Sequence, residues 1–147
     1  MSRDILPRYA GRVVLRRLGI ADLADFQAYR RDPEVARYQG WQAVADAEAR
    51  SFLAEANTGQ LLRPGHWCQI GIADASTGRL IGDLGLHVAA DEGEAEIGIS
   101  LNRSAHGRGL AGEAFREAIR LVFEHTEANE IMGITDARNL PSIRLLE

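Results

Sequence analysis

The chain has 147 residues, 46% of them hydrophobic, which is enough for one globular domain with a packed core. Its formal net charge is −4 and it has no basic tract, so nucleic acid is not an expected partner. A lone Cys68 excludes an internal disulfide, four scattered histidines predict no metal site, and the absence of a long apolar run or leader predicts a cytoplasmic protein without a membrane span.

The first part of the chain is expected to form one strand and two helices. Residues 13–18 are largely apolar and predict a short strand. Asp22 is expected to cap a helix that stops before Pro33, because the residue ahead of a proline avoids helical angles. Apolar residues at helical spacing predict a second helix over residues 44–56.

Three strands follow, over residues 67–73, 79–88 and 94–101. Two short turns rich in Ser, Thr, Asp and Gly separate them, so an antiparallel meander is predicted. A glycine-rich stretch then leads into a long helix that ends near residue 126, and residues 131–135 predict another strand. Asn139 is placed to cap a last helix. One face of the long helix is expected to be exposed to solvent and carries Glu113, Arg116, Glu117, Arg120 and Glu124.

The resulting element order is β-α-α-β-β-β-α-β-α. It predicts an α+β protein with a mixed, mostly antiparallel central sheet flanked by helices. We found no linker, repeat or low-complexity segment, so residues 1–147 are expected to form a single domain.

The stretch HGRGLAG, residues 106–112, is the strongest functional signal. Its glycines match G-x-G-x-x-G, but a dinucleotide-binding fingerprint belongs to the first βαβ unit of a parallel sheet, and here the loop follows an antiparallel meander. Such a loop still leads into a helix amino terminus, whose unpaired N–H groups attract an anion. With Arg103 and Arg108 adding positive charge, it suits a pyrophosphate.

The segment HGRGLAGEA resembles the acyl-CoA pyrophosphate loop of the GNAT N-acetyltransferase superfamily, Gln/Arg-x-x-Gly-x-Gly/Ala, with His106 in place of the usual first residue. The segments LIGDLGL, EIGISL, DPEVARY and NLPSIRLLE are similar to the ribosomal-protein (RimJ/RimL-like) branch. The resemblance covers nearly the whole chain. It implies the GNAT fold, acetyl-CoA as cofactor and N-acetyltransferase activity.

The same resemblance assigns roles to residues. In that family the strand corresponding to residues 97–101 splays from its neighbour and pairs with pantetheine. The cofactor-binding residues are then expected to be Ile99, Leu101, His106, Gly107, Arg108, Gly109, Leu110, Ala111, Gly112 and Asn139. Ser142 is a candidate to protonate the leaving thiolate, with helix capping as the alternative. Tyr38 and Trp41 are expected to line the acceptor pocket.

The family continues beyond the last predicted helix with further strands, whereas this sequence stops at Glu147. The carboxyl-terminal strands are therefore expected to be missing, which would leave a sheet edge beside residues 131–135. Because exposed edges invite pairing, the chain is expected to be marginally stable or to form a homodimer.

Candidates for the general base follow from which residues of neighbouring strands share one face of the sheet. If the turn at Asp91-Glu92 is even, His87 lies opposite Glu96, and extending the pattern across the preceding turn places His66 in the same row. One hypothesis makes Glu96, or His87, a general base acting directly or through water. The alternative is a cross-strand polar pair that only fixes the register.

The predicted reaction is acetyl transfer from acetyl-CoA to a primary amine, either a protein N-terminus or a small metabolite. The alternative is a GNAT-like module that binds acyl-CoA without turnover, or serves as a partner-binding scaffold. A dinucleotide-binding protein is disfavoured by the strand order.

Overall fold

The computed structural model describes residues 5–33, 45–105 and 107–133. Its elements are, in chain order, β1 (Arg8–Ala10), β2 (Val13–Arg16), a short 3-10 helix η1 (Ile20–Asp22), α1 (Leu23–Arg30), α3 (Asp46–Thr58), β3 (Trp67–Asp74), β4 (Leu80–Val88), β5 (Glu94–Leu101), a second 3-10 helix η2 (Arg103–Ala105), α4 (Leu110–His125) and β6 (Glu130–Gly133). The predicted elements within these ranges are present, and β1 precedes them.

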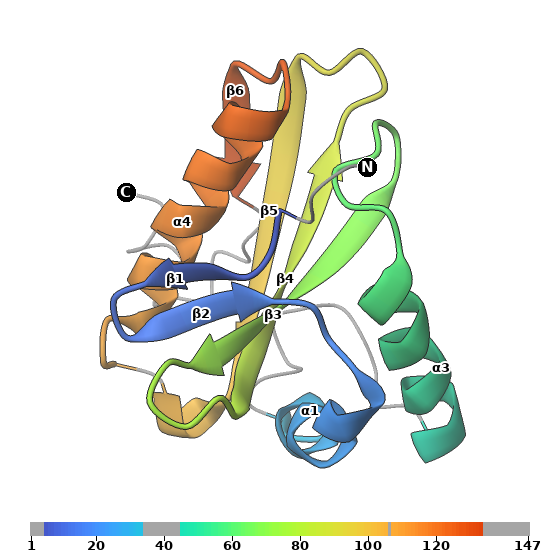
Figure 1. The fold of residues 1–147 in the computed structure, drawn as a ribbon, viewed down its shortest axis with the longest axis vertical. Coiled ribbons are helices and arrows are strands. Elements are labelled where there is room, and N and C mark those ends of the chain that lie inside the picture. Colours follow the sequence, from blue (N-terminus) through green and yellow to red (C-terminus); the bar gives the residue numbers. More distant parts are fainter. Residues whose placement is uncertain (1–4, 34–44, 106, 134–147) are drawn as a thin grey trace.

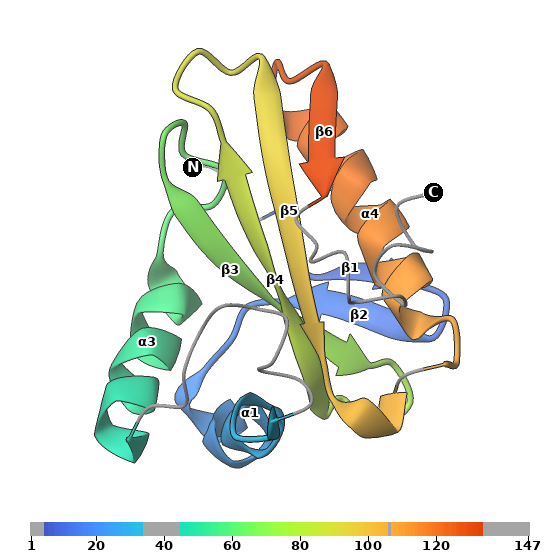
Figure 2. The same ribbon diagram turned by 180° about the vertical axis from the view of Figure 1, so that it is seen from behind.

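The strands form one mixed sheet in the order β1-β2-β3-β4-β5-β6 (Figures 1 and 2). All neighbouring pairs are antiparallel except β5 and β6, which run parallel. The long helix α4 packs against β1, β2 and β5, whereas α1 packs against β4 and α3. The predicted α+β architecture, a mostly antiparallel sheet flanked by helices, is confirmed.

Two apolar clusters fill the spaces on either side of the sheet. The larger one joins α4 to the strands through residues such as Leu84, Leu86 and Ile97, all essentially buried. The smaller one joins α1 and α3 to the sheet through Phe26, Leu53 and neighbours. Figure 2 shows that α1 lies beneath the lower part of the sheet. On the face seen there, no described helix crosses the carboxyl half of β4 or the amino half of β5, whereas α4 packs on the other face.

The charged face of α4 is exposed at Arg116, Arg120 and Glu124, as predicted, but not at Glu117, where the prediction was wrong. Glu117 is 7% exposed, and Arg8 of β1 reaches both Glu117 (2.6 Å) and Glu124 (2.8 Å). The sequence did not predict β1, which has only three residues. The hairpin of β1 and β2 therefore covers one side of α4 and neutralises its acidic residues.

Asp22 does not cap α1 with its side chain, which corrects the prediction. Its carboxylate instead accepts the Gly19 N–H at 2.9 Å and pairs with Arg16 of β2 at 2.8 Å. The prediction failed because a 3-10 turn precedes α1 and already occupies residues 20–22. Asp22 therefore ties the end of β2 to the start of the first helix.

Asp83 of β4 is the most connected buried carboxylate in the described residues. It is 2% exposed and accepts hydrogen bonds from the Tyr29 hydroxyl, from Arg30 (2.8 and 2.9 Å) and from Gln69 (3.0 Å). Burial, with the negative charge of Asp83 next, raises the pKa of Tyr29 well above its ordinary value, so the hydroxyl stays a donor. The guanidinium of Arg30 also lies 4.8 Å from the centre of the Phe26 ring.

We predict that Asp83→Ala lowers the free energy of unfolding by about 3–5 kcal/mol, because it removes the counter-charge of a mostly buried guanidinium. Chemical denaturation measures this. Glu94→Ala, at the exposed start of β5, is the control and should change the free energy of unfolding by less than about 0.5 kcal/mol. Equal small effects of both substitutions would show that the cluster does not hold α1 on the sheet.

Candidate active site

The glycine-rich loop has the backbone geometry of an anion site. Gly107 and Gly109 have φ angles of 74° and 76°, in the left-handed region that glycine adopts at little cost, and Gly109 is the N-cap of α4. A Cβ built on Gly107 would meet no described residue within 4 Å, so within the described part of the chain this backbone is uncovered. Beyond Gly109, the first N–H groups of α4 have no intrahelical acceptor. His106 lies outside the described residues.

The cations around the loop differ from those expected. Arg103 donates to Asp32 at 3.0 Å, so its guanidinium is bound to the segment that directly follows α1. Arg108 is exposed, and its positive charge contributes to the lowered pKa of Asp74, after the hydrogen bonds from Ser76 and Thr77. Arg108 therefore remains the loop's own cation.

Arg12, in the turn between β1 and β2, was missed. Its Nε donates to Glu113 at 3.1 Å, and its Nη2 lies 3.2 Å from the position that a Cβ on Gly109 would take. Arg12 and Gly109 are 97 residues apart in sequence, so only the packing of the hairpin on α4 reveals that this cation lies beside the loop.

The polar row on the sheet is confirmed in part. His87 pairs with Glu96 across β4 and β5, as the even turn predicted. His66 is not in this row, because Ile81 forms a β-bulge that shifts the β3–β4 register by one residue and brings Trp67 opposite His87. The rings of Trp67 and His87 lie 5.1 Å apart, and Trp67 is 52% exposed.

Beside this row, Gly85 of β4 faces Gly98 of β5, and this glycine pair is called the trough below. The Gln69 amide oxygen and the Trp67 ring lie over Gly85, at 2.7 and 3.5 Å from the position of a Cβ there. The open part is above Gly98, where a Cβ would meet no described atom within 4 Å. The next pair, Asp83 and Ser100, is buried and closes one end of the trough.

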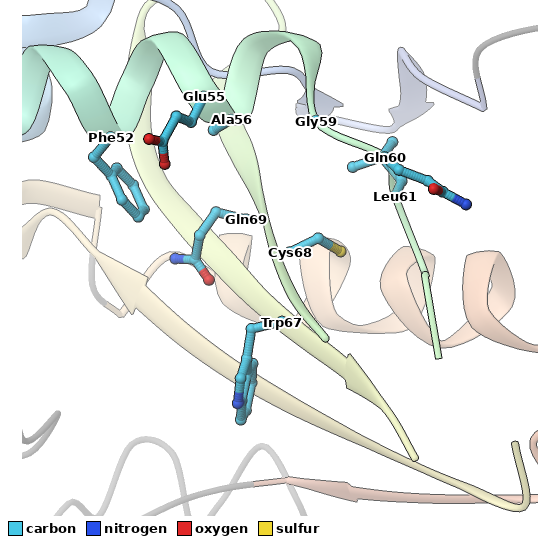
Figure 3. A pocket seen from close by; sticks show the side chains of 9 residues that line it. All are labelled: Phe52, Glu55, Ala56, Gly59, Gln60, Leu61, Trp67, Cys68 and Gln69. Atoms are coloured by element: carbon cyan, nitrogen blue, oxygen red, sulfur yellow. The ribbon is translucent and has the colours of Figure 1, made fainter. Parts of the chain in front are cut away.

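A pocket of about 170 Å³ opens between α3 and β3 (Figure 3). Phe52 and Glu55 reach it from the helix, and Trp67 and Gln69 reach it from the strand. Cys68 points away from Trp67 and Gln69, and burial raises the pKa of its thiol, which therefore stays protonated at neutral pH. The pocket joins aromatic surface to one carboxylate, Glu55, and two amides, Gln60 and Gln69.

Several predicted site residues cannot be placed. Tyr38, Trp41, Asn139 and Ser142 lie outside the described residues. Ile99 and Leu101 lie on β5, beyond its described pairing with β6, which runs from Glu94↔Glu130 to Ile97↔Gly133. The predicted separation of residues 97–101 from a neighbouring strand remains a prediction.

The fold and two local features suit an acyl-CoA-dependent transferase. The glycine-lined amino terminus of α4 has the geometry of an anion site, and the sheet face opposite α4 carries a carboxylate–imidazole pair. The model of the GNAT acetyltransferase domain matches residues 12–147, and the chain belongs to that family.

The relatives agree with this assignment. The chain is 32% identical over 140 residues to the uncharacterized N-acetyltransferase p20 of Bacillus licheniformis, covering 94% of this chain and 78% of that protein. A GNAT-family acetyltransferase from Bacillus anthracis has a similar fold, with a TM-score of 0.81 at 20% identity over 95% of this chain and 80% of the other. An aminoglycoside acetyltransferase in complex with coenzyme A has a TM-score of 0.72 at 21% identity, over 90% and 80%.

Members of this family transfer the acetyl group of acetyl-CoA, so acetyl-CoA is the cofactor. The described residues fit it: Gly107 and Gly109 leave a backbone cradle that side chains would fill, next to Arg12 and Arg108. Within the described ranges, no three His, Cys, Asp or Glu side chains are grouped to hold a metal ion, and no helix is long and apolar enough to cross a membrane.

We predict that Gly109→Val weakens coenzyme A binding by about 2–3 kcal/mol, because a side chain strains a left-handed residue and blocks the amides at the helix start. Calorimetry with coenzyme A measures this. Gly65→Val is the matched control, because Gly65 also has a left-handed φ of 82°. Its N–H donates to Val88 at the carboxyl end of β4, whereas the glycine-rich loop follows the end of β5 that pairs with the amino end of β4. The control variant should therefore keep the affinity for coenzyme A. Equal affinities of folded Gly109→Val and wild type would exclude the loop as the pyrophosphate site.

Proposed function

We propose that this acetyltransferase acts on a primary amine, either a protein N-terminus or a small amine, as in the RimJ/RimL-like branch. The single observation that carries the proposal is the row of Trp67, His87 and Glu96 beside the trough of Gly85 and Gly98. It places a carboxylate and an aromatic surface next to open space on the sheet face. An amine that is a cation at neutral pH suits this surface.

In this proposal Glu96 is the general base. Acetyl-CoA, when bound, supplies an acetyl group activated as a thioester. Glu96 is half-buried on β5, and its carboxylate would attract an ammonium group and accept its proton, directly or through water. His87 lies directly opposite and is the second candidate for this proton. Ser142 is retained as the proposed proton donor to the leaving sulfur.

Two acceptor classes are supported by names among the structural neighbours. One neighbour, from Vibrio cholerae, is provisionally assigned as a ribosomal-protein-serine acetyltransferase (TM-score 0.77, 19% identity), and others act on aminoglycosides. Glu55 at the pocket and Glu96 in the row suit cationic acceptors of both kinds. Tyr38 and Trp41 are proposed to complete the acceptor site.

The test is release of free thiol from acetyl-CoA with a panel of amines that includes serine-starting peptides, aminoglycosides and simple alkylamines. The sequence contains no lysine, so the enzyme offers no ε-amine that would compete with the panel. We expect amine-dependent thiol release with an acetylated amine as product. Coenzyme A binding without turnover of any amine would favour the alternative, a non-catalytic acyl-CoA-binding module.

With the best amine, Glu96→Gln should lower kcat about a hundredfold or more and leave acetyl-CoA affinity nearly unchanged. Rates measured from pH 6 to pH 9 should show an acidic limb in wild type that disappears in the variant. If the limb persists and only the melting temperature falls, then Glu96 is a structural partner of His87 and the amine's own ionisation explains the pH dependence.

A further inference from the structure

Gln69 has an orientation that its hydrogen bonds fix. Its Nε2 donates to Oδ1 of Asp83 at 3.0 Å. Asp83 also accepts from Tyr29 and Arg30, so its oxygens act as acceptors in this cluster and hold the NH₂ end of the amide toward themselves. The carbonyl end of Gln69 must then point away from the buried cluster.

That carbonyl oxygen extends over β4. It lies 2.7 Å from the position that a Cβ on Gly85 would take, and the Trp67 ring lies 3.5 Å from the same position. Any side chain at residue 85 would therefore displace the amide. Since Gly98 is the residue opposite Gly85 on β5, the oxygen points across a glycine floor toward the trough.

No described residue donates a hydrogen bond to this oxygen, although the other end of the same amide is bound to a buried carboxylate. Gln69 also lines the pocket between α3 and β3, with Phe52 and Glu55 facing it from the helix (Figure 3). A fixed acceptor that lies over Gly85, in the row of Gly98 and next to the row of Glu96, is suited to an N–H donor.

We propose that Gln69 is an acceptor-binding residue whose Oε1 accepts an N–H of the substrate amine and holds its nitrogen over Gly98. This inference rests on the proposed function and names a residue of its amine site. The ligand class is a primary amine or ammonium, which has enough N–H groups for both Gln69 and a base. Asp83, with Tyr29 and Arg30 behind it, is the positioning group that keeps the oxygen aimed at the trough.

The test compares Gln69→Met with Glu127→Met. Methionine keeps the length of glutamine and removes the acceptor, and Glu127 is exposed on the segment after α4, away from the pocket and the row. We expect Gln69→Met to lower kcat/KM for the amine roughly 10- to 100-fold, mainly through the amine's KM, while the KM for acetyl-CoA is unchanged. Glu127→Met should stay within about twofold of wild type.

Gly85→Ala tests the position of the Gln69 oxygen without removing the Gln69 side chain. It keeps the amide and its bond to Asp83 available, but its methyl group displaces Oε1, so it should weaken use of the amine in the same direction as Gln69→Met. Calorimetric titration of a serine-starting peptide amide and of an aminoglycoside, with coenzyme A present, gives amine affinities that do not depend on turnover.

The outcomes are distinct. Turnover by wild type with equal kinetics for both methionine variants overturns the role of Gln69 and leaves the proposed function intact. Amine binding without turnover overturns the transfer reaction, and the role of Gln69 is then judged from the affinities alone. If wild type neither binds nor acetylates any amine, both proposals fail.

Discussion

The register of β3, β4 and β5 is the constraint on which the candidate site depends. It sets three parallel rows on one face of the sheet: Gly71, Asp83 and Ser100; Gln69, Gly85 and Gly98; Trp67, His87 and Glu96. Because side chains alternate between faces, a shift of one residue on either strand pair would move a row to the opposite face. The bulge at Ile81 is therefore part of the site, since it brings Trp67 rather than His66 beside His87.

The three rows differ in burial and in the roles that we assign to them. The row of Asp83 is buried and anchors α1 through Tyr29 and Arg30. The row of Glu96 is accessible and has the ionisable groups that we propose for acyl transfer. Between the two rows, Gly98 leaves open backbone at the proposed substrate position, and Gln69 connects this row to the buried network. The buried cluster of Asp83 with Tyr29 and Arg30 thus fixes the position of Gln69 beside the proposed site.

The sequence allowed much of this architecture to be predicted, for local physical reasons. The strands of the meander and the start of α4 follow from turn residues and glycines, and the pairing of His87 with Glu96 follows from a short, even turn. The bulge at Ile81 has one marker, Gly82 inside the strand, but β4 also has Gly85, so the sequence alone does not show which residue is bulged. The contacts of Asp83 with Tyr29, and of Arg8 with Glu117, join residues 54 and 109 positions apart, so only tertiary packing creates them.

The central claim is that acyl transfer takes place in the trough between β4 and β5, and a side chain placed there tests it most directly. Gly98 is in ordinary strand geometry with open space above it, and valine is favoured in strands, so Gly98→Val should fold with a melting temperature near that of wild type. Its amine-dependent thiol release should fall at least about a hundredfold, because the reacting groups lose their aligned positions. Retention of wild-type turnover by this folded variant would place the reaction elsewhere on the protein and contradict the account.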